Sequence, residues 1–188
     1  WASAALGPSM HLQQDEIDIP EAWGQTKARL RDGDMPPVVL VVGGVDCGKT
    51  TLAHYLAAAG GEYDEAALVD ADLGQSVIGP PATAGLRLPL QEGDVADRKT
   101  VLRFVGDVSP PGSLVQLFCA VLRLVQRARG TPGVGQVVID SSGFLRGDMA
   151  REFKFNLIEG LKPLSLAVLE KERDELSPLT KAFRDDPS

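Results

Sequence analysis

The chain has 188 residues, of which 44% are hydrophobic and 24% charged, and its formal net charge is −7. These values exclude the disordered and collagen-like classes and suit one principal globular domain. The negative net charge argues against electrostatic binding of nucleic acid over a broad surface, because such binding needs clustered lysine and arginine side chains. No run reaches the roughly 20 apolar residues of a membrane helix.

Two features indicate a cytoplasmic protein. The first 20 residues lack the charged start and apolar run of a signal peptide. Cys47 and Cys119 are too few for a disulfide framework, and neither has the spacing of a zinc site, so we expect a reducing compartment. We expect no membrane contact, and the sequence does not indicate an oligomeric state.

The chain divides into a polar start and a main domain. Residues 1–33 form a predicted N-terminal extension, in which apolar spacing favours a short helix over Glu21 to Arg31. Residues 34–188 form the predicted main domain. It opens with the β-branched run VVLVVGG (38–44), typical of a strand covered on both faces, and continues with a helix over KTTLAHYLAAAG (49–60).

Later segments repeat this alternation. Strands are predicted at 66–72, 101–107, 136–140 and 165–170, and helices at 113–129 and 149–161. Strands that alternate with helices predict an α/β fold with a mostly parallel sheet flanked by helices. In such sheets ligands bind beyond the carboxyl ends of the strands, which is where the polar residues of this chain collect.

A phosphate-binding loop follows the first predicted strand. The segment Gly43 to Thr50 (GGVDCGKT) matches G-x-x-x-x-G-K-[ST] and opens a predicted helix, which is the context that this motif requires. Its backbone N–H groups and the helix dipole favour phosphate. Lys49 is expected to reach the β- and γ-phosphates of ATP or GTP, and Thr50 to hold Mg²⁺. The residues expected to bind the nucleotide are Gly43, Gly44, Val45, Asp46, Cys47, Gly48, Lys49, Thr50 and Thr51.

Acidic residues end two further strands. Asp70 and Asp72 are two residues apart, so their side chains share one face while the chain stays extended. One acid can coordinate Mg²⁺ and the other can accept the proton of an attacking hydroxyl. In the alternative interpretation the strand end is merely polar, with one acid capping a turn. Asp140 occupies the position expected for a second Mg²⁺-associated acid.

Two loops at the same edge of the sheet are candidates for substrate binding. Ser141 and Ser142 can contact phosphate or substrate, and Phe144 can either stack on a nucleobase or pack in the core. The segment 105–113 (VGDVSPPGS) is a stiff polar loop, which either binds substrate or only connects two elements.

With these residues in place, the chain resembles the polynucleotide 5′-hydroxyl kinase family, whose eukaryotic members act in pre-mRNA 3′-end cleavage, tRNA splicing and ribosomal RNA processing. The resemblance runs from about Val38 to Glu170, through GGVDCGKTTLAHYL, VDADLGQSVIGPPAT, FVGDVSPPGS, IDSSGFLRG and FKFNLIEGLKP. The D-x-D-x-G-Q element is its most specific part. The resemblance implies a P-loop NTPase domain that carries the γ-phosphate of ATP or GTP to the 5′-OH end of RNA or DNA.

The resemblance also implies roles for single residues. Lys49 and Thr50 correspond to the phosphate and Mg²⁺ ligands, Asp72 to the general base, and Asp70 to a support for the metal. The family's T-x-G-W clasp, which holds the terminal nucleotides of the substrate, corresponds to the segment Ser141-Ser142-Gly143-Phe144, with Ser for Thr and Phe for Trp. The residues expected to bind the substrate are Gln75, Ser109, Ser141, Ser142, Gly143 and Phe144.

One family element does not align. Members carry arginines on a lid over the phosphates, and the candidates here are Lys171, Arg173, Lys181 and Arg184. The flanking domains of the family are also not recognised. Two other functions therefore stay open: a nucleotide-binding switch or assembly factor with little kinase activity, and a small-molecule kinase or ligase. Without an N-K-x-D motif the sequence does not separate ATP from GTP, or RNA from DNA.

Overall fold

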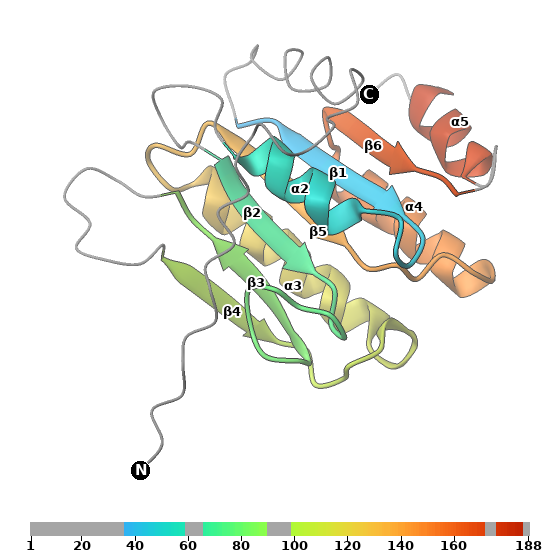
Figure 1. The fold of residues 1–188 in the computed structure, drawn as a ribbon, viewed down its shortest axis with the longest axis horizontal. Helices are drawn as coiled ribbons and strands as arrows, with labels where there is room; N and C mark the ends of the chain where they lie inside the picture. The colour runs from blue at the N-terminus through green and yellow to red at the C-terminus, as the bar shows by residue number, and fades with distance from the viewer. Residues whose placement is uncertain (1–35, 59–65, 90–98, 172–175, 186–188) are drawn as a thin grey trace.

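The computed structural model describes residues 36–58, 66–89, 99–171 and 176–185. The helix predicted over Glu21 to Arg31 lies outside these residues. Six strands form one sheet in the order β4-β3-β2-β5-β1-β6 (Figure 1). The strands are β1 (Val38–Gly43), β2 (Ala66–Ala71), β3 (Thr83–Arg87), β4 (Thr100–Phe104), β5 (Gln136–Ser141) and β6 (Ser165–Leu169).

The centre of the sheet is parallel. β5 pairs with β1 and β2, and β1 pairs with β6, in each case in parallel. Every residue of β1 is buried, which explains its uninterrupted run of valine and leucine, because a central parallel strand is covered on both faces. The predicted α/β fold with a mostly parallel sheet is confirmed.

Helices cover both faces of this sheet (Figure 1). They are α2 (Lys49–Ala57), α3 (Leu114–Arg129), α4 (Asp148–Leu161) and α5 (Ser177–Asp185). The apolar face of α2 packs on one side against Val41 and Val138, whereas α3 and α4 pack on the other side, against Ile139 and its neighbours. The helices predicted at 113–129 and 149–161 are thus confirmed.

The β3–β4 hairpin corrects the predicted alternation. We expected the strand at 101–107 to continue a parallel series, and β3 was not predicted. In the structure β3 runs antiparallel to both β2 and β4. The segment between β2 and β3 is too short for a crossover helix, so the chain returns directly. The chain reverses between β2 and β3 and again between β3 and β4, so β4 runs in the same direction as β2. It therefore ends at the edge of the sheet where β1, β2 and β5 end.

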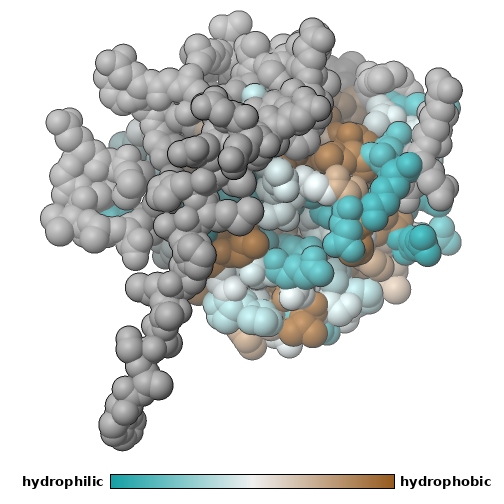
Figure 2. Space-filling model, in the orientation of Figure 1, coloured by the Kyte–Doolittle hydropathy of each residue, from teal (hydrophilic) through white to brown (hydrophobic). Residues whose placement is uncertain are grey.

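The surface of the described residues is mixed. On the face in Figure 2, apolar residues form small separate patches between hydrophilic ones. Across the described part of the chain, no helix is long and apolar enough to cross a membrane.

Candidate active site

The loop between β1 and α2 turns sharply at the carboxyl edge of the sheet. Gly48, which caps α2, has φ of 88°, and Asp46 has φ of 56°. A Cβ atom on Gly43 would lie 2.7 Å from Leu169 O, so only glycine lets the loop leave the strand here. The strand, turn and helix expected of a phosphate-binding loop are present.

Lys49 lies inside this loop. Its side chain is buried, with 7% exposure, and its Nζ donates a hydrogen bond to Gly44 O at 2.7 Å. An ammonium group has three donors, so this bond leaves it able to bind phosphate oxygens as well. The loop therefore holds a cation at the place where the sequence predicts the β- and γ-phosphates.

Thr50 and Asp140 form a pair that joins α2 to the end of β5. Thr50 Oγ1 donates to Asp140 Oδ2 at 2.7 Å, and Asp140 Oδ1 is buried with no hydrogen-bond partner among the described residues. Burial raises the pKa of Asp140 to about 6, and the bond from Thr50 offsets part of this effect. A buried carboxylate with one unused oxygen beside a hydroxyl is a suitable donor set for Mg²⁺, which prefers oxygen ligands.

The described residues form no complete protein cage for a metal, since no group of three or more His, Cys, Asp or Glu side chains gathers among them. Mg²⁺ usually keeps several waters and binds through one or two carboxylates and substrate phosphates, so Thr50 and Asp140 can serve as its protein ligands.

Asp70 organises the turn that follows β2. Its side chain is 1% exposed and accepts four hydrogen bonds. Oδ1 receives Asp72 N–H at 3.0 Å, and Oδ2 receives Ser76 Oγ at 2.9 Å, Val77 N–H at 2.6 Å and Ile78 N–H at 3.2 Å. This geometry agrees with the alternative interpretation, an acid that caps a turn. The metal role predicted for Asp70 stays a prediction.

Asp72 lies two residues further on and is half-buried. Its Oδ1 accepts hydrogen bonds from the N–H groups of Gly74 and Gln75, both at 3.1 Å, which fixes the direction of the carboxylate. The other oxygen, Oδ2, accepts no hydrogen bond from the described residues. Asp70 and Asp140 are direct neighbours on β2 and β5, so Asp72 lies at the same edge as the Thr50 pair.

The loop after β4 touches the Asp72 turn. A Cβ atom on Gly74 would lie 3.1 Å from Val108 O, so the two segments are in close contact. Within this loop Ser109 N–H donates to Asp107 Oδ1 at 3.0 Å, and Ser109 itself is exposed. The sequence prediction that this loop and the Asp72 turn share one edge of the sheet is confirmed.

The Ser141–Phe144 segment lies directly against the phosphate-binding loop. Ser141 Oγ donates to Val41 O, in β1, at 2.7 Å. A Cβ atom on Gly143 would lie 2.7 Å from Val45 Cγ2 and 3.0 Å from Val45 N. Phe144 is half-buried, a burial that fits both stacking and core packing. The predicted substrate segment and the loop are therefore neighbours.

Lys154, on α4, contacts this segment and was missed by the sequence analysis. It is completely buried, and its Nζ donates to Ser141 Oγ at 3.0 Å and to Ser142 O at 2.9 Å. Burial lowers the pKa of Lys154 to about 7, and the nearby Lys49 acts in the same direction. A signal existed: Lys154 falls four residues after Ala150 and three before Leu157, on the buried face of α4.

The lid stays a prediction. Lys171 and Lys181 are exposed. Arg173 lies outside the described residues, as does the side chain of Arg184.

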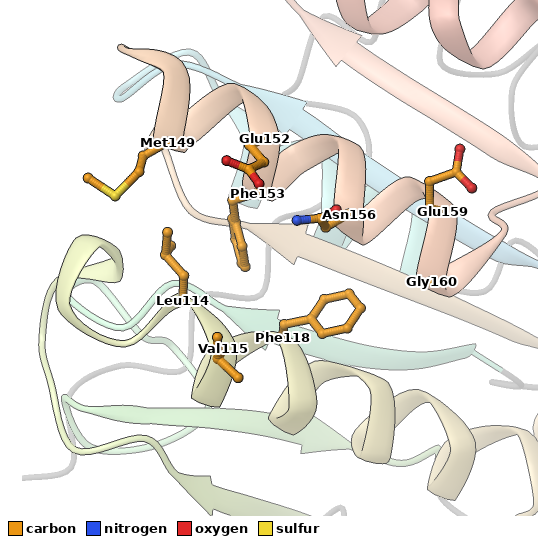
Figure 3. A pocket seen from close by; sticks show the side chains of 9 residues that line it. All are labelled: Leu114, Val115, Phe118, Met149, Glu152, Phe153, Asn156, Glu159 and Gly160. Carbon is orange, nitrogen blue, oxygen red and sulfur yellow. The ribbon is translucent and has the colours of Figure 1, made fainter.

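A cavity of about 490 Å³ lies elsewhere, between α3 and α4. Figure 3 shows the side chain of Phe153 pointing from α4 toward α3. The cavity is lined by Leu114, Val115, Phe118, Met149, Glu152, Phe153, Asn156, Glu159 and Gly160. The charged side chains among these lining residues are carboxylates, so the cavity does not suit phosphate, and none of these residues belongs to the predicted site.

Sequence comparison links the chain to known proteins. The family model of the mRNA cleavage and polyadenylation factor CLP1 P-loop matches residues 43–187. A polyribonucleotide 5′-hydroxyl-kinase of Pyrococcus furiosus is 34% identical over 89% of this chain, and one of Thermococcus kodakarensis is 35% identical over 88%. Each alignment covers 47% of the relative, so the chain spans about half the length of these curated relatives.

Structure comparison agrees on the fold. A chain of the wild-type Clp1p–Pcf11p complex superposes with a TM-score of 0.66 and 20% identity, over 86% of this chain and 44% of that one. A second structure superposes with a TM-score of 0.65 and 19% identity, with the same coverage of both chains. It describes the extended interface between Pcf11p and Clp1p and the structural basis for ATP loss in a point mutant. At these identities the likeness shows a shared fold.

Proposed function

We propose that this chain, which belongs to the mRNA cleavage and polyadenylation factor CLP1 P-loop family, acts as a polynucleotide 5′-hydroxyl kinase. It transfers the γ-phosphate of ATP or GTP to the 5′-OH end of RNA or DNA. The observation that carries the proposal is that one edge of the sheet gathers Lys49, the Thr50–Asp140 pair and the unused oxygen of Asp72. The names of the relatives favour RNA as the acceptor.

Each group at this edge has a part in the transfer. The loop amides and Lys49 bind the β- and γ-phosphates, and Thr50 and Asp140 hold Mg²⁺, which when bound offsets phosphate charge. Asp72 Oδ2 accepts the proton of the attacking 5′-hydroxyl. The O5′–Pγ bond forms while the bond between Pγ and the β-phosphate oxygen breaks, and the nucleoside diphosphate leaves. For Asp70 we propose an indirect part, which is to fix the turn that carries Asp72.

The acceptor is held at the same edge of the sheet, next to the phosphate-binding loop. We assign its terminal nucleotides to the Ser141–Phe144 segment, with Gln75 and Ser109 as further contacts. Both of these residues are exposed and can be reached from solvent. Ser142 Oγ is buried with no partner among the described residues, so it can still donate a hydrogen bond to a bound group.

The domain division and the location also stay proposals. We assign kinase activity to residues 34–188 and treat residues 1–33 as an extension. A cytoplasmic location is supported by Cys47 and Cys119, which are both free thiols, because reducing compartments keep thiols in that form.

A transfer assay tests the proposed function. The protein is incubated with γ-labelled ATP or GTP, Mg²⁺ and oligoribonucleotides or oligodeoxyribonucleotides that carry either a 5′-OH or a 5′-phosphate. We expect label on the 5′-OH oligonucleotide alone. Hydrolysis of the nucleotide without a labelled oligonucleotide would instead indicate a switch or assembly factor.

Asp72→Asn tests the general base. The substitution removes the proton acceptor but keeps an oxygen for the Gly74 and Gln75 amides, so we expect folding to persist while kcat falls about 10²- to 10⁴-fold. Glu159→Gln is the matched control, because this exposed glutamate on α4 has no part in the site. Wild-type kcat in Asp72→Asn would exclude Asp72 as the base.

A further inference from the structure

Lys154 is a buried lysine that core packing does not explain. It comes first in volume among the completely buried side chains of the described residues. Removing an ammonium group from water is unfavourable, and an apolar side chain of similar volume usually fills such a position at least as well. The reason for a lysine here must therefore lie in what its ammonium group contacts.

The ammonium group holds one short segment at two consecutive residues. It donates to the side chain of Ser141, at 3.0 Å, and to the backbone carbonyl of Ser142, at 2.9 Å. Both acceptors follow directly after Asp140, in the segment that leads to Phe144. One side chain from α4 thus fixes both the backbone and a hydroxyl group of this segment.

The same segment is tied to the strand that leads into the phosphate-binding loop. Ser141 Oγ, which accepts from Lys154, donates in turn to Val41 O at 2.7 Å. Beyond this bond, Gly143 packs against Val45 so closely that no side chain fits. α4, the segment and β1 are therefore joined by a continuous set of hydrogen bonds inside the core.

We propose that Lys154 is a positioning residue for the acceptor, which fixes the Ser141–Phe144 segment from inside the protein. This inference rests on the proposed function, because that function assigns the terminal nucleotides of the acceptor to the segment. Lys154 has no exposed surface and cannot touch the substrate. It acts only through the residues that it holds in place, as supporting hydrogen bonds do in other sites.

The loss of Lys154 affects acceptor binding more than nucleotide binding. No bond joins Lys154 to the loop from Gly43 to Thr50, whose own cation, Lys49, is held by Gly44 O. At Gly143 the segment meets this loop by packing against Val45. A loosened segment therefore misplaces the acceptor first, and a misplacement of about 1 Å lowers the rate about 10²-fold.

Lys154→Met tests the inference, because methionine keeps most of the volume and removes both hydrogen bonds. We expect the KM for a 5′-OH oligoribonucleotide to rise about tenfold or more, while the Kd of a fluorescent ATP analogue with Mg²⁺ stays near the wild-type value. Leu157→Ala is the matched control: it is completely buried on the same helix, destabilises the core, and leaves the segment in place. Equal acceptor KM values in the two variants would overturn the inference.

Ser141→Ala is the second variant, and it tests the same inference if Lys154→Met does not fold. It removes one of the two acceptors of Lys154, so we expect a smaller rise in acceptor KM in the same direction. Hydrogen–deuterium exchange of the amides at 141–146 gives a readout without activity, and Lys154→Met or Ser141→Ala should accelerate it whereas Leu157→Ala should not. If the wild type transfers no phosphate, the proposed function fails, and the exchange result alone decides whether Lys154 fixes the segment.

Discussion

Replacing Asp70 by asparagine separates two roles for this residue, anchoring the turn after β2 and binding Mg²⁺. The new side chain keeps one oxygen, which can receive the three bonds now made to Oδ2, from Ser76, Val77 and Ile78. Its amide group then faces Asp72 N–H, so that bond is lost. The other three bonds change from a charged to a neutral acceptor.

The size of the effect follows from these four bonds. A hydrogen bond to a charged group contributes about 1.5–3 kcal/mol, and one to a neutral group about 0.5–1.5 kcal/mol. The turn is partly open to water, which replaces some of this energy, so we expect the free energy of unfolding to fall by about 3 kcal/mol. For a chain of this size, the Tm then falls by about 6–12 °C.

Thermal unfolding measures this loss, and titration with a fluorescent ATP analogue, with and without Mg²⁺, measures the metal dependence of binding. Asp148→Asn is the control: its side chain is fully exposed, at 101%, and such surface changes stay within about 0.5 kcal/mol. We expect Asp70→Asn to lower the Tm and to retain the Mg²⁺ dependence. An unchanged Tm together with a lost Mg²⁺ dependence would show that Asp70 binds the ion, and would refute the reasoning.

Two further substitutions test the neighbouring contacts. Burial raises the pKa of Asp140 to about 6 from its usual 3.8, so between these pH values the folded protein binds more protons than the unfolded chain. The contribution of Asp140 to the free energy of unfolding, measured by urea without nucleotide, should therefore fall by about 2 kcal/mol as the pH rises from about 4 to 6. Asp140→Asn should remove this fall, and an identical pH dependence in the variant would contradict the assignment. Gly143→Ala places a methyl group 2.7 Å from Val45 Cγ2, so we expect a loss of about 1–3 kcal/mol in stability and weaker nucleotide binding. Gly130→Ala, whose Cβ has room at 3.4 Å from its nearest neighbour, is the control, and equal nucleotide affinities in the two variants would argue against the close contact.

The phosphate-binding loop was predictable because its signal is local. Gly43, Gly48, Lys49 and Thr50 stand at fixed spacing between an apolar strand and a helix, and that context alone fixes where the backbone amides point. Asp140 was predictable for a similar reason, since a polar residue at the end of an apolar strand marks the carboxyl edge of a parallel sheet.

Other features depend on contacts between distant segments. β3 has only five residues and contains Gly85, whose missing side chain is replaced by Ile78 from the preceding loop, so no alternation of apolar residues marks it as a strand. The different roles of Asp70 and Asp72 could not be predicted from the sequence either, because they depend on which backbone amides the turn brings to each carboxylate. Lysine is a typical surface residue, so the sequence analysis passed over Lys154 although its spacing from Ala150 and Leu157 places it on the buried face of α4.

The two ends of the paired strands β3 and β4 lie far apart. Near the Asp72 turn, Val105 N–H donates to Ala82 O at 2.9 Å, and at the opposite end Leu88 N–H donates to Lys99 O, also at 2.9 Å. A five-residue strand separates these bonds by about 17 Å. A group attached to the exposed Lys99 would therefore lie remote from the chemistry. This position is a permissive attachment point for a fluorophore, an affinity tag or a surface tether.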